Sequence, residues 1–178
     1  MNAAFLATDG AKVTIKNSQV SSSAKNGNGL FSYGKGTELD AQNVTIQTTG
    51  DNSGGIQTTG GATTQAWNLN IHTTGNSAAA IRSDRGGGTA QVTTENQKLQ
   101  GAIVVDTISK LDLNLGKGTD FKGTISQVEN KTGEATGSID VKVAKGATWE
   151  LTGDSTVTTL QNQGKIKKNG YKLTVLSK

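Results

Sequence analysis

The 178-residue sequence contains no cysteine and no proline, and aromatic residues make up only 4% of it. Without cysteine the chain can form neither a disulfide framework nor a thiolate zinc site. No apolar run approaches the roughly 20 residues that a membrane-spanning helix needs, so we expect no direct membrane span. Hydrophobic residues reach 32%, below the usual share of about 45–50%. A core this poor in large side chains requires small residues that stack very regularly.

The charge of the chain gives no indication of a nucleic-acid partner. Eighteen Lys and Arg against 14 Asp and Glu leave a formal net charge of +4. The basic residues are interspersed with acidic ones, whereas nucleic-acid-binding domains gather them on one face with aromatics between them. A local excess of lysine near the C-terminus is typical of an exposed edge strand, where lysine discourages pairing with other chains. These lysines are Lys165, Lys167, Lys168, Lys172 and Lys178.

A repeat of about 25 residues organises the first half of the sequence. Residues 55–71 match residues 30–46, and both segments run into Thr-Thr-Gly. Residues 80–83 continue the pattern one period later. Apolar residues alternate within each period, as in Val44 and Ile46, which is strand periodicity. We therefore expect short strands separated by Gly, Asn and Asp turns, with His72 and Gln57 facing outward beside buried isoleucines.

Short strands repeated at this period describe the coils of a β-solenoid. A leucine-rich repeat is excluded because its L-x-x-L-x-L pattern and a helical half-repeat are missing. We predict an all-β chain: a single-stranded, right-handed parallel β-helix of about seven coils, with the handedness following the general crossover preference. The expected columns of aligned residues are Leu6, Phe31, Ile56 and Ile81 on one face and Val20, Val44 and Leu69 on another.

The second half keeps the strands with a different spacing. Residues 111–121 match residues 139–149 at an offset of 28, which places Phe121 and Trp149 at the same interior position. Around Asn169-Gly170 we expect two short strands that form a β-hairpin cap over the last coil. The predicted organisation is one β-helix domain over 1–178, made of regular coils in 1–92, an irregular connection in 93–110, and closing coils with the cap in 111–178.

Several segments carry a family resemblance. They are residues 2–5, 27–34, 53–56, 80–88, 146–155 and 160–166. In these segments the chain resembles the passenger-type β-helices of bacterial autotransporters and related adhesin-like proteins with a pectin-lyase-like fold. The resemblance implies a secreted or cell-surface protein that acts in adhesion or self-association, with glycans or surface molecules as partners. Such proteins carry a signal peptide and an anchoring segment, so we expect this chain to be an excised or shortened portion.

The fold class also contains polysaccharide lyases and hydrolases, which would need catalytic residues on the outer surface. A hydrolase needs two carboxylates that flank the scissile bond. The outward carboxylates fall at different positions of the repeat, at Glu38, Asp40, Asp51 and Asp84. We therefore predict a non-enzymatic protein without cofactor or metal, and keep a polysaccharide-active enzyme or carbohydrate-binding β-helix as the alternative.

Three short sites are candidates for binding. Arg82, Asp84 and Arg85 form either an ion pair that shapes a turn or a pair of guanidinium groups for an anionic glycan or carboxylate. Trp67 is expected to be partly exposed, where a sugar ring could stack on it. His72 is expected on the outer surface of a strand, and a lone histidine gives little support to a metal site.

Two further features bear on partners. Thr-Thr pairs at 48–49 and 73–74 resemble the flat threonine arrays of ice-binding proteins, which we keep as a less favoured alternative. Residues 3–7 are apolar and uncharged and lie at one end of the expected solenoid. Because an unprotected edge strand templates pairing with other chains, we expect any homo-association to use this N-terminal edge.

Overall fold

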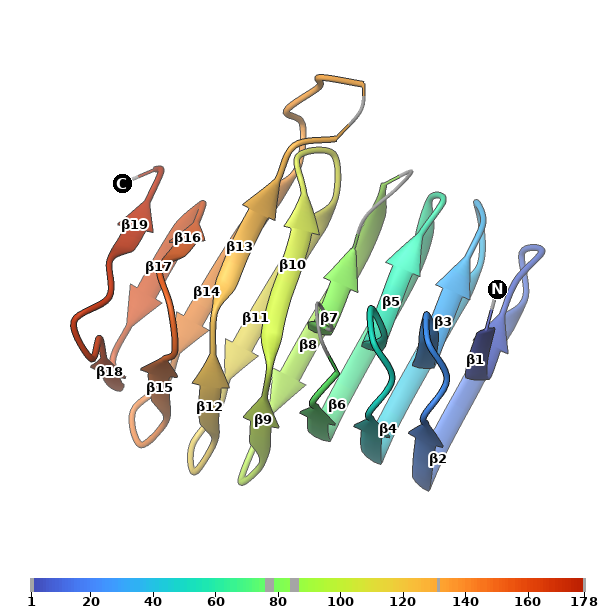
Figure 1. Ribbon diagram of the computed structural model, residues 1–178, viewed down its shortest axis with the longest axis horizontal. Helices are drawn as coiled ribbons and strands as arrows, with labels where there is room; N and C mark the ends of the chain where they lie inside the picture. The colour runs from blue at the N-terminus through green and yellow to red at the C-terminus, as the bar shows by residue number, and fades with distance from the viewer. Residues whose placement is uncertain (1, 76–78, 84–86, 131, 178) are drawn as a thin grey trace.

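The chain folds as a parallel β-solenoid of about six turns, which confirms the predicted all-β architecture (Figure 1). The computed structural model describes residues 2–75, 79–83, 87–130 and 132–177, and these residues form strands and turns without any helix. No membrane-spanning helix is therefore present in this part of the chain. Six parallel strands stack in the first sheet. They are β1 (Asn2–Ala7), β3 (Gly27–Tyr33), β5 (Gly54–Thr59), β7 (Ala79–Ser83), β10 (Ala102–Asp106) and β13 (Ile125–Val128).

The second sheet has two parts, which we call the first arm and the second arm. In the first three coils a single long strand supplies both arms, namely β2 (Lys12–Ser22), β4 (Glu38–Thr48) and β6 (Ala62–Thr73). Strand β6 pairs with two separate strands of the fourth coil, so the arms divide there. The first arm continues as β8 (Gly88–Thr94), β11 (Lys110–Leu115), β14 (Ser138–Val143) and β17 (Thr159–Asn162). The second arm continues as β9 (Lys98–Gln100), β12 (Asp120–Gly123), β15 (Thr148–Leu151) and β18 (Lys165–Lys167).

An asparagine marks the boundary between the two arms in each long strand. Asn17, Asn43 and Asn68 adopt positive φ angles of 48°, 53° and 53°, a conformation that asparagine tolerates better than most residues. Their side chains form a ladder, in which Asn43 Nδ2 donates to Asn17 Oδ1 at 3.0 Å and Asn68 Nδ2 donates to Asn43 Oδ1 at 3.2 Å. The next coil has residues 95–97 at this corner, and Asn68 Oδ1 has no hydrogen-bond partner among the described residues.

The first-sheet column differs in register from the expected one. Ile81 aligns with Ile56 as predicted, but Leu30 rather than Phe31 is the partner of Ile56. Leu6 is 41% exposed and lies outside the core. The reason is the length of the turns. The path from β5 to β6 through Gly60-Gly61 is one residue shorter than the path from β3 to β4. A constant period of 25 residues therefore cannot align the strands of both sheets.

The expected alignment of Val20 was wrong for the same reason. Strands β2 and β4 pair at an offset of 26 residues, which places Val20 beside Ile46 instead of Val44. The following coil returns to an offset of 25, so Val44 and Leu69 align as predicted. Each of these side chains is buried.

The predicted 28-residue offset of the second half is confirmed. Phe121 and Trp149 are register partners, and their rings stack with centroids 5.7 Å apart and planes at 21°. Trp149 Nε1 also donates a hydrogen bond of 3.2 Å to the Gly123 carbonyl. In residues 93–110, where we expected an irregular connection, the chain forms β9 and β10, and Ile103 of β10 aligns with Ile81.

The C-terminal end does not form the predicted hairpin. Strand β19 (Leu173–Val175) pairs in parallel with β16 (Ser155–Val157), and β18 pairs in parallel with β15. Asn169 and Gly170 do form a turn, with φ angles of 51° and 85°. The chain therefore keeps winding after this turn instead of folding back on itself. Because the described residues contribute six strands to the first sheet, the expected seven coils become about six.

Ile71 and His72, neighbours on β6, test the inward and outward faces of one strand. Ile71 is buried in the core, and His72 is exposed. We expect Ile71→Asp to lower the free energy of unfolding by more than about 3 kcal/mol, because it buries an unpaired carboxylate. His72→Asp should change it by less than about 0.5 kcal/mol. Chemical denaturation followed by circular dichroism measures both values, and similar losses would contradict the assigned faces.

Candidate functional site

Outward side chains stand in columns, because in-register coils place equivalent residues side by side. We call the outward surface of the first arm the first-arm face, and it carries three columns. The columns are Lys12, Glu38, Thr63, Thr89 and Lys110; then Thr14, Asp40, Gln65, Gln91 and Asp112; then Lys16, Gln42, Trp67, Thr93 and Asn114. Amide, hydroxyl and charged groups thus recur from coil to coil on a continuous sheet.

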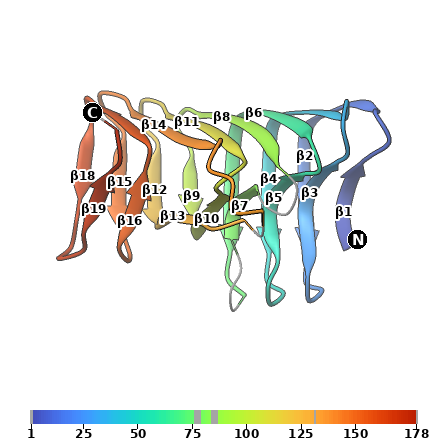
Figure 2. The same cartoon turned by 90° about the horizontal axis from the view of Figure 1, so that it is seen from above.

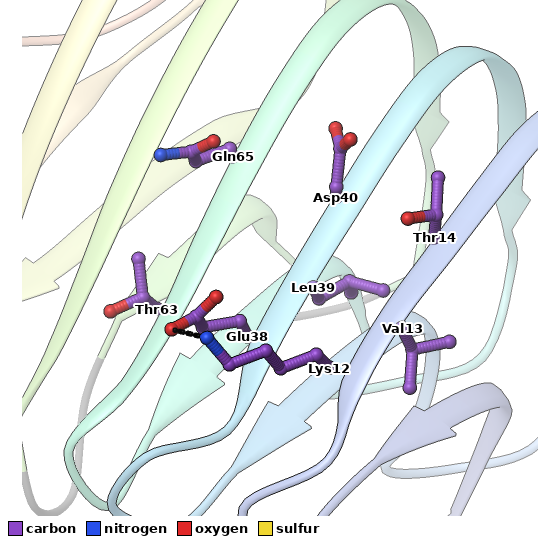
Figure 3. Close-up of a pocket in the computed structure, with 8 residues that line it drawn as sticks. All are labelled: Lys12, Val13, Thr14, Glu38, Leu39, Asp40, Thr63 and Gln65. Atoms are coloured by element: carbon purple, nitrogen blue, oxygen red, sulfur yellow. Dashed lines mark ion pairs between the residues drawn. The ribbon is translucent and has the colours of Figure 1, made fainter.

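A shallow hollow of about 430 Å³ lies on the first-arm face across β2, β4 and β6 (Figure 3). Its outward side chains are Lys12, Thr14, Glu38, Asp40, Thr63 and Gln65. Lys12 Nζ lies 3.1 Å from Glu38 Oε1, and these side chains are 75% and 54% exposed. An ion pair this exposed contributes little to stability, about 0–1 kcal/mol. Both charges therefore remain accessible to a ligand.

Side-chain hydrogen bonds connect the columns of this face. Gln42 Nε2 donates to Asp40 Oδ2 at 2.8 Å, and Gln65 Nε2 donates to Gln91 Oε1 at 3.5 Å. The first bond orients an amide beside a carboxylate on one strand, and the second joins two coils. The face therefore presents partly oriented polar groups.

Trp67 lies on the same face as the hollow, two residues after Gln65. It aligns with Gln42 on one side, as predicted, and with Thr93 on the other. Its side chain is 46% exposed, in agreement with the expected partial exposure. The structure thus places an accessible aromatic ring among amide and hydroxyl groups.

His72 lies on the second arm, beyond the Asn68 corner from Trp67. It aligns with Gln47, as predicted, and with Gln100. An open hollow of about 450 Å³ includes its side chain and that of Lys98. The first-arm face and His72 are therefore separate sites. No group of three His, Cys, Asp or Glu that could hold a metal ion occurs in the described part of the chain.

The described residues do not include the side chains of the arginine cluster predicted from the sequence. The backbone of Arg82 pairs with Gln57 of β5 and Val104 of β10. Its side chain, together with Asp84 and Arg85, lies outside the described residues. Both interpretations of this cluster therefore stay predictions.

Sequence inspection missed that Glu38 and Asp40 share one hollow. These residues are two positions apart on a strand, a spacing that puts side chains on one face. The alternating pattern carries this signal, whereas the positions of the two residues in the repeat do not. Among the described residues, Glu38 and Asp40 are therefore the two carboxylates best placed to act together on a ligand.

In each of the threonine pairs at 48–49 and 73–74, one side chain is buried and the other is exposed. Thr48 and Thr73 are buried, and Thr48 Oγ1 donates to Thr73 Oγ1 at 3.0 Å. Thr58 is also buried, with its hydroxyl 2.7 Å from Thr64 Oγ1. These buried threonines bond one another inside the solenoid, whereas Thr49 and Thr74 are exposed, so ice binding stays a less favoured prediction.

Comparison with known proteins adds no relative: no family model, no curated protein and no solved structure matches this chain. The description as a parallel β-solenoid therefore rests on the strand pairing itself.

The two tryptophans differ in accessibility, which gives a direct test of the candidate site. In Trp149→Phe, which retains Trp67, iodide should quench fluorescence several-fold more strongly than in Trp67→Phe, which retains buried Trp149. The reason is that a charged quencher reaches only a solvent-exposed ring. Equal quenching of the two folded variants would show that Trp67 is covered.

Proposed function

We propose that the chain is a non-enzymatic interaction module of a secreted or surface-exposed bacterial protein, and that it acts in adhesion. The observation that carries this proposal is the first-arm face, where exposed Trp67 stands within columns of amide, hydroxyl and carboxylate side chains. The resemblance to autotransporter passengers supports the location, and the regular strand pairing supports a rigid scaffold.

The geometry of the first-arm face favours an extended polar polymer as ligand. Successive strands are about 4.8 Å apart, so equivalent groups recur at a spacing comparable with one sugar unit of an extended glycan. A sugar ring can stack on Trp67, while Gln42 and Gln65 bond its hydroxyl groups. Binding would then rely on several weak contacts along the chain.

A glycan array tests this proposal. We expect wild-type protein to bind a subset of extended glycans and Trp67→Ala to weaken that binding about tenfold, since an aromatic anchor typically contributes more than 1 kcal/mol. His72→Ala is the matched control, because it alters an exposed ring on the same strand but on the other arm. Equal loss in both variants, or no binding by wild-type protein, would argue against the first-arm face.

A polysaccharide hydrolase is the second candidate function, because Glu38 and Asp40 line one hollow. Glycoside hydrolysis uses two carboxylates, one of which must give up a proton to the leaving group. Against this role, Glu38 is exposed and paired with Lys12, and Asp40 accepts a hydrogen bond from Gln42. An open hollow also excludes little water from the reacting groups.

Incubation with pectin, polygalacturonate and common glycans, with and without calcium, separates the two functions. We expect no release of reducing or unsaturated ends above the level of a heat-inactivated sample. Release of saturated reducing ends that Glu38→Gln or Asp40→Asn abolishes would establish the hydrolase instead, whereas unsaturated ends would indicate a lyase; Thr63→Ala in the same hollow serves as the control for folding.

A further inference from the structure

The outward surface of the second arm, which we call the second-arm face, differs in charge from the first-arm face. The columns of the first-arm face hold three lysines and three acids, whose charges cancel. Alternation along β9, β12, β15 and β18 places four lysines and two acids on the second-arm face. They are Lys98, Lys122, Lys165 and Lys167 with Asp120 and Glu150. The second-arm face is therefore the more positive of the two.

Two hollows on the second-arm face meet at β9. One, of about 450 Å³, crosses β4, β6 and β9, and the other, of about 290 Å³, crosses β9, β12, β15 and β18. Lys98 and Gln100 line both hollows, which we together call the second-arm groove. The strands that the groove crosses follow one another along the solenoid (Figure 2). At about 4.8 Å between successive strands the groove is about 24 Å long, enough for several units of a linear polymer.

One carboxylate positions two lysines of the second-arm groove. Lys122 Nζ lies 3.6 Å from Glu150 Oε1, and Lys167 Nζ lies 3.5 Å from Glu150 Oε2. Glu150 stands between the two lysines because β15 pairs with β12 on one side and with β18 on the other. The lysine side chains are 60% and 45% exposed, whereas that of Glu150 is 30% exposed. The two cations are thus more accessible than the anion that holds them.

Lys98 adds a third cation where the two hollows meet. Its backbone N–H donates to Asn70 Oδ1 at 3.1 Å, which ties β9 to the preceding coil. Its register partner on β12 is Asp120, and both side chains are exposed, but the ion pairs among the described residues do not include Lys98. The larger hollow has no acidic residue in its lining. Lys98 therefore gives that part of the groove a positive charge.

We propose that the second-arm groove binds a linear anionic polysaccharide, whose carboxylate or sulfate groups contact Lys98, Lys122 and Lys167. Exposed ion pairs are weak, so an anionic group of the ligand can compete with Glu150 for the lysines that it holds. Lys122 and Lys167 stand two coils apart, about 10 Å, a spacing comparable with that of charges on every second sugar of an extended chain.

The other side chains of the second-arm groove suit a sugar better than a nucleic acid. Gln47 and Gln100 are exposed amides that can bond hydroxyl groups. The groove presents no exposed aromatic ring among its described lining residues, whereas single-stranded nucleic acids are bound by stacking their bases on such rings. The groove lies on the other arm from Trp67, so its ligand does not depend on the one proposed for the first-arm face.

Isothermal titration calorimetry with polygalacturonate and with dextran sulfate tests the groove for the two kinds of anionic group. We expect at least one of them to bind, less tightly at higher salt because exposed charges are screened, and uncharged dextran not to bind. Lys98→Gln and Lys122→Gln should each raise the dissociation constant about threefold. Lys35→Gln is the matched control, since it removes the same charge from an exposed turn between β3 and β4. It should leave the dissociation constant unchanged.

Glu150→Gln should have the opposite effect on binding. It releases Lys122 and Lys167 for the ligand, so the affinity should rise about threefold, with circular dichroism unchanged. Glu134→Gln makes the same change of charge in the exposed loop between β13 and β14 and should leave the affinity unchanged.

Trp67→Ala distinguishes this groove from the first-arm face, because it should bind the charged polymers as wild-type protein does. Four results would each overturn the proposal. They are no binding of either charged polymer, equal losses in Lys35→Gln and Lys98→Gln, weaker binding by folded Glu150→Gln, and tighter binding of duplex DNA than of either polysaccharide.

Discussion

Parallel in-register pairing between successive coils is the constraint on which the rest of this structure depends. Each strand receives its backbone partners from the coil before and the coil after, so the position of one coil determines the position of the next. A side chain therefore meets its equivalent in the neighbouring coil. This arrangement explains how a chain with few aromatic residues builds a core: Ile56, Ile81 and Ile103 cover one another in a single buried column.

The same constraint moves all irregularity into the corners and turns. Offsets between paired residues vary from 17 for Trp149 and Ile166 to 28 for Phe121 and Trp149, yet both pairs align against the core. The chain absorbs the difference where strands end. Asparagine at positive φ makes the corner in the early coils, and its side chain extends the backbone ladder by a hydrogen bond between coils.

The sequence predicted those features that alternate with a period of two residues and failed where turn length decides. Buried Leu111 and Leu113, the Phe121–Trp149 stack and the outward His72 all follow from alternation. The alignment of Leu30 instead of Phe31 with Ile56 could not be predicted from an averaged repeat length. An average does not show that one glycine turn is a residue shorter than its equivalent. The carboxy-terminal hairpin was expected because a local Asn-Gly turn favours it, but parallel pairing with the preceding coil prevailed.

A solenoid presents two kinds of surface, and the two kinds favour different partners. Its sides have satisfied backbone groups, so recognition there depends on outward side chains such as Trp67 and Asp40, which repeat imperfectly and can select a ligand. The end of any solenoid instead presents strand edges with unpaired backbone groups, and such edges favour another strand as partner. In β18, Lys165 and Lys167 are exposed, and lysine on an edge strand opposes such pairing. The outward columns and the strand edges are therefore separate surfaces of one chain.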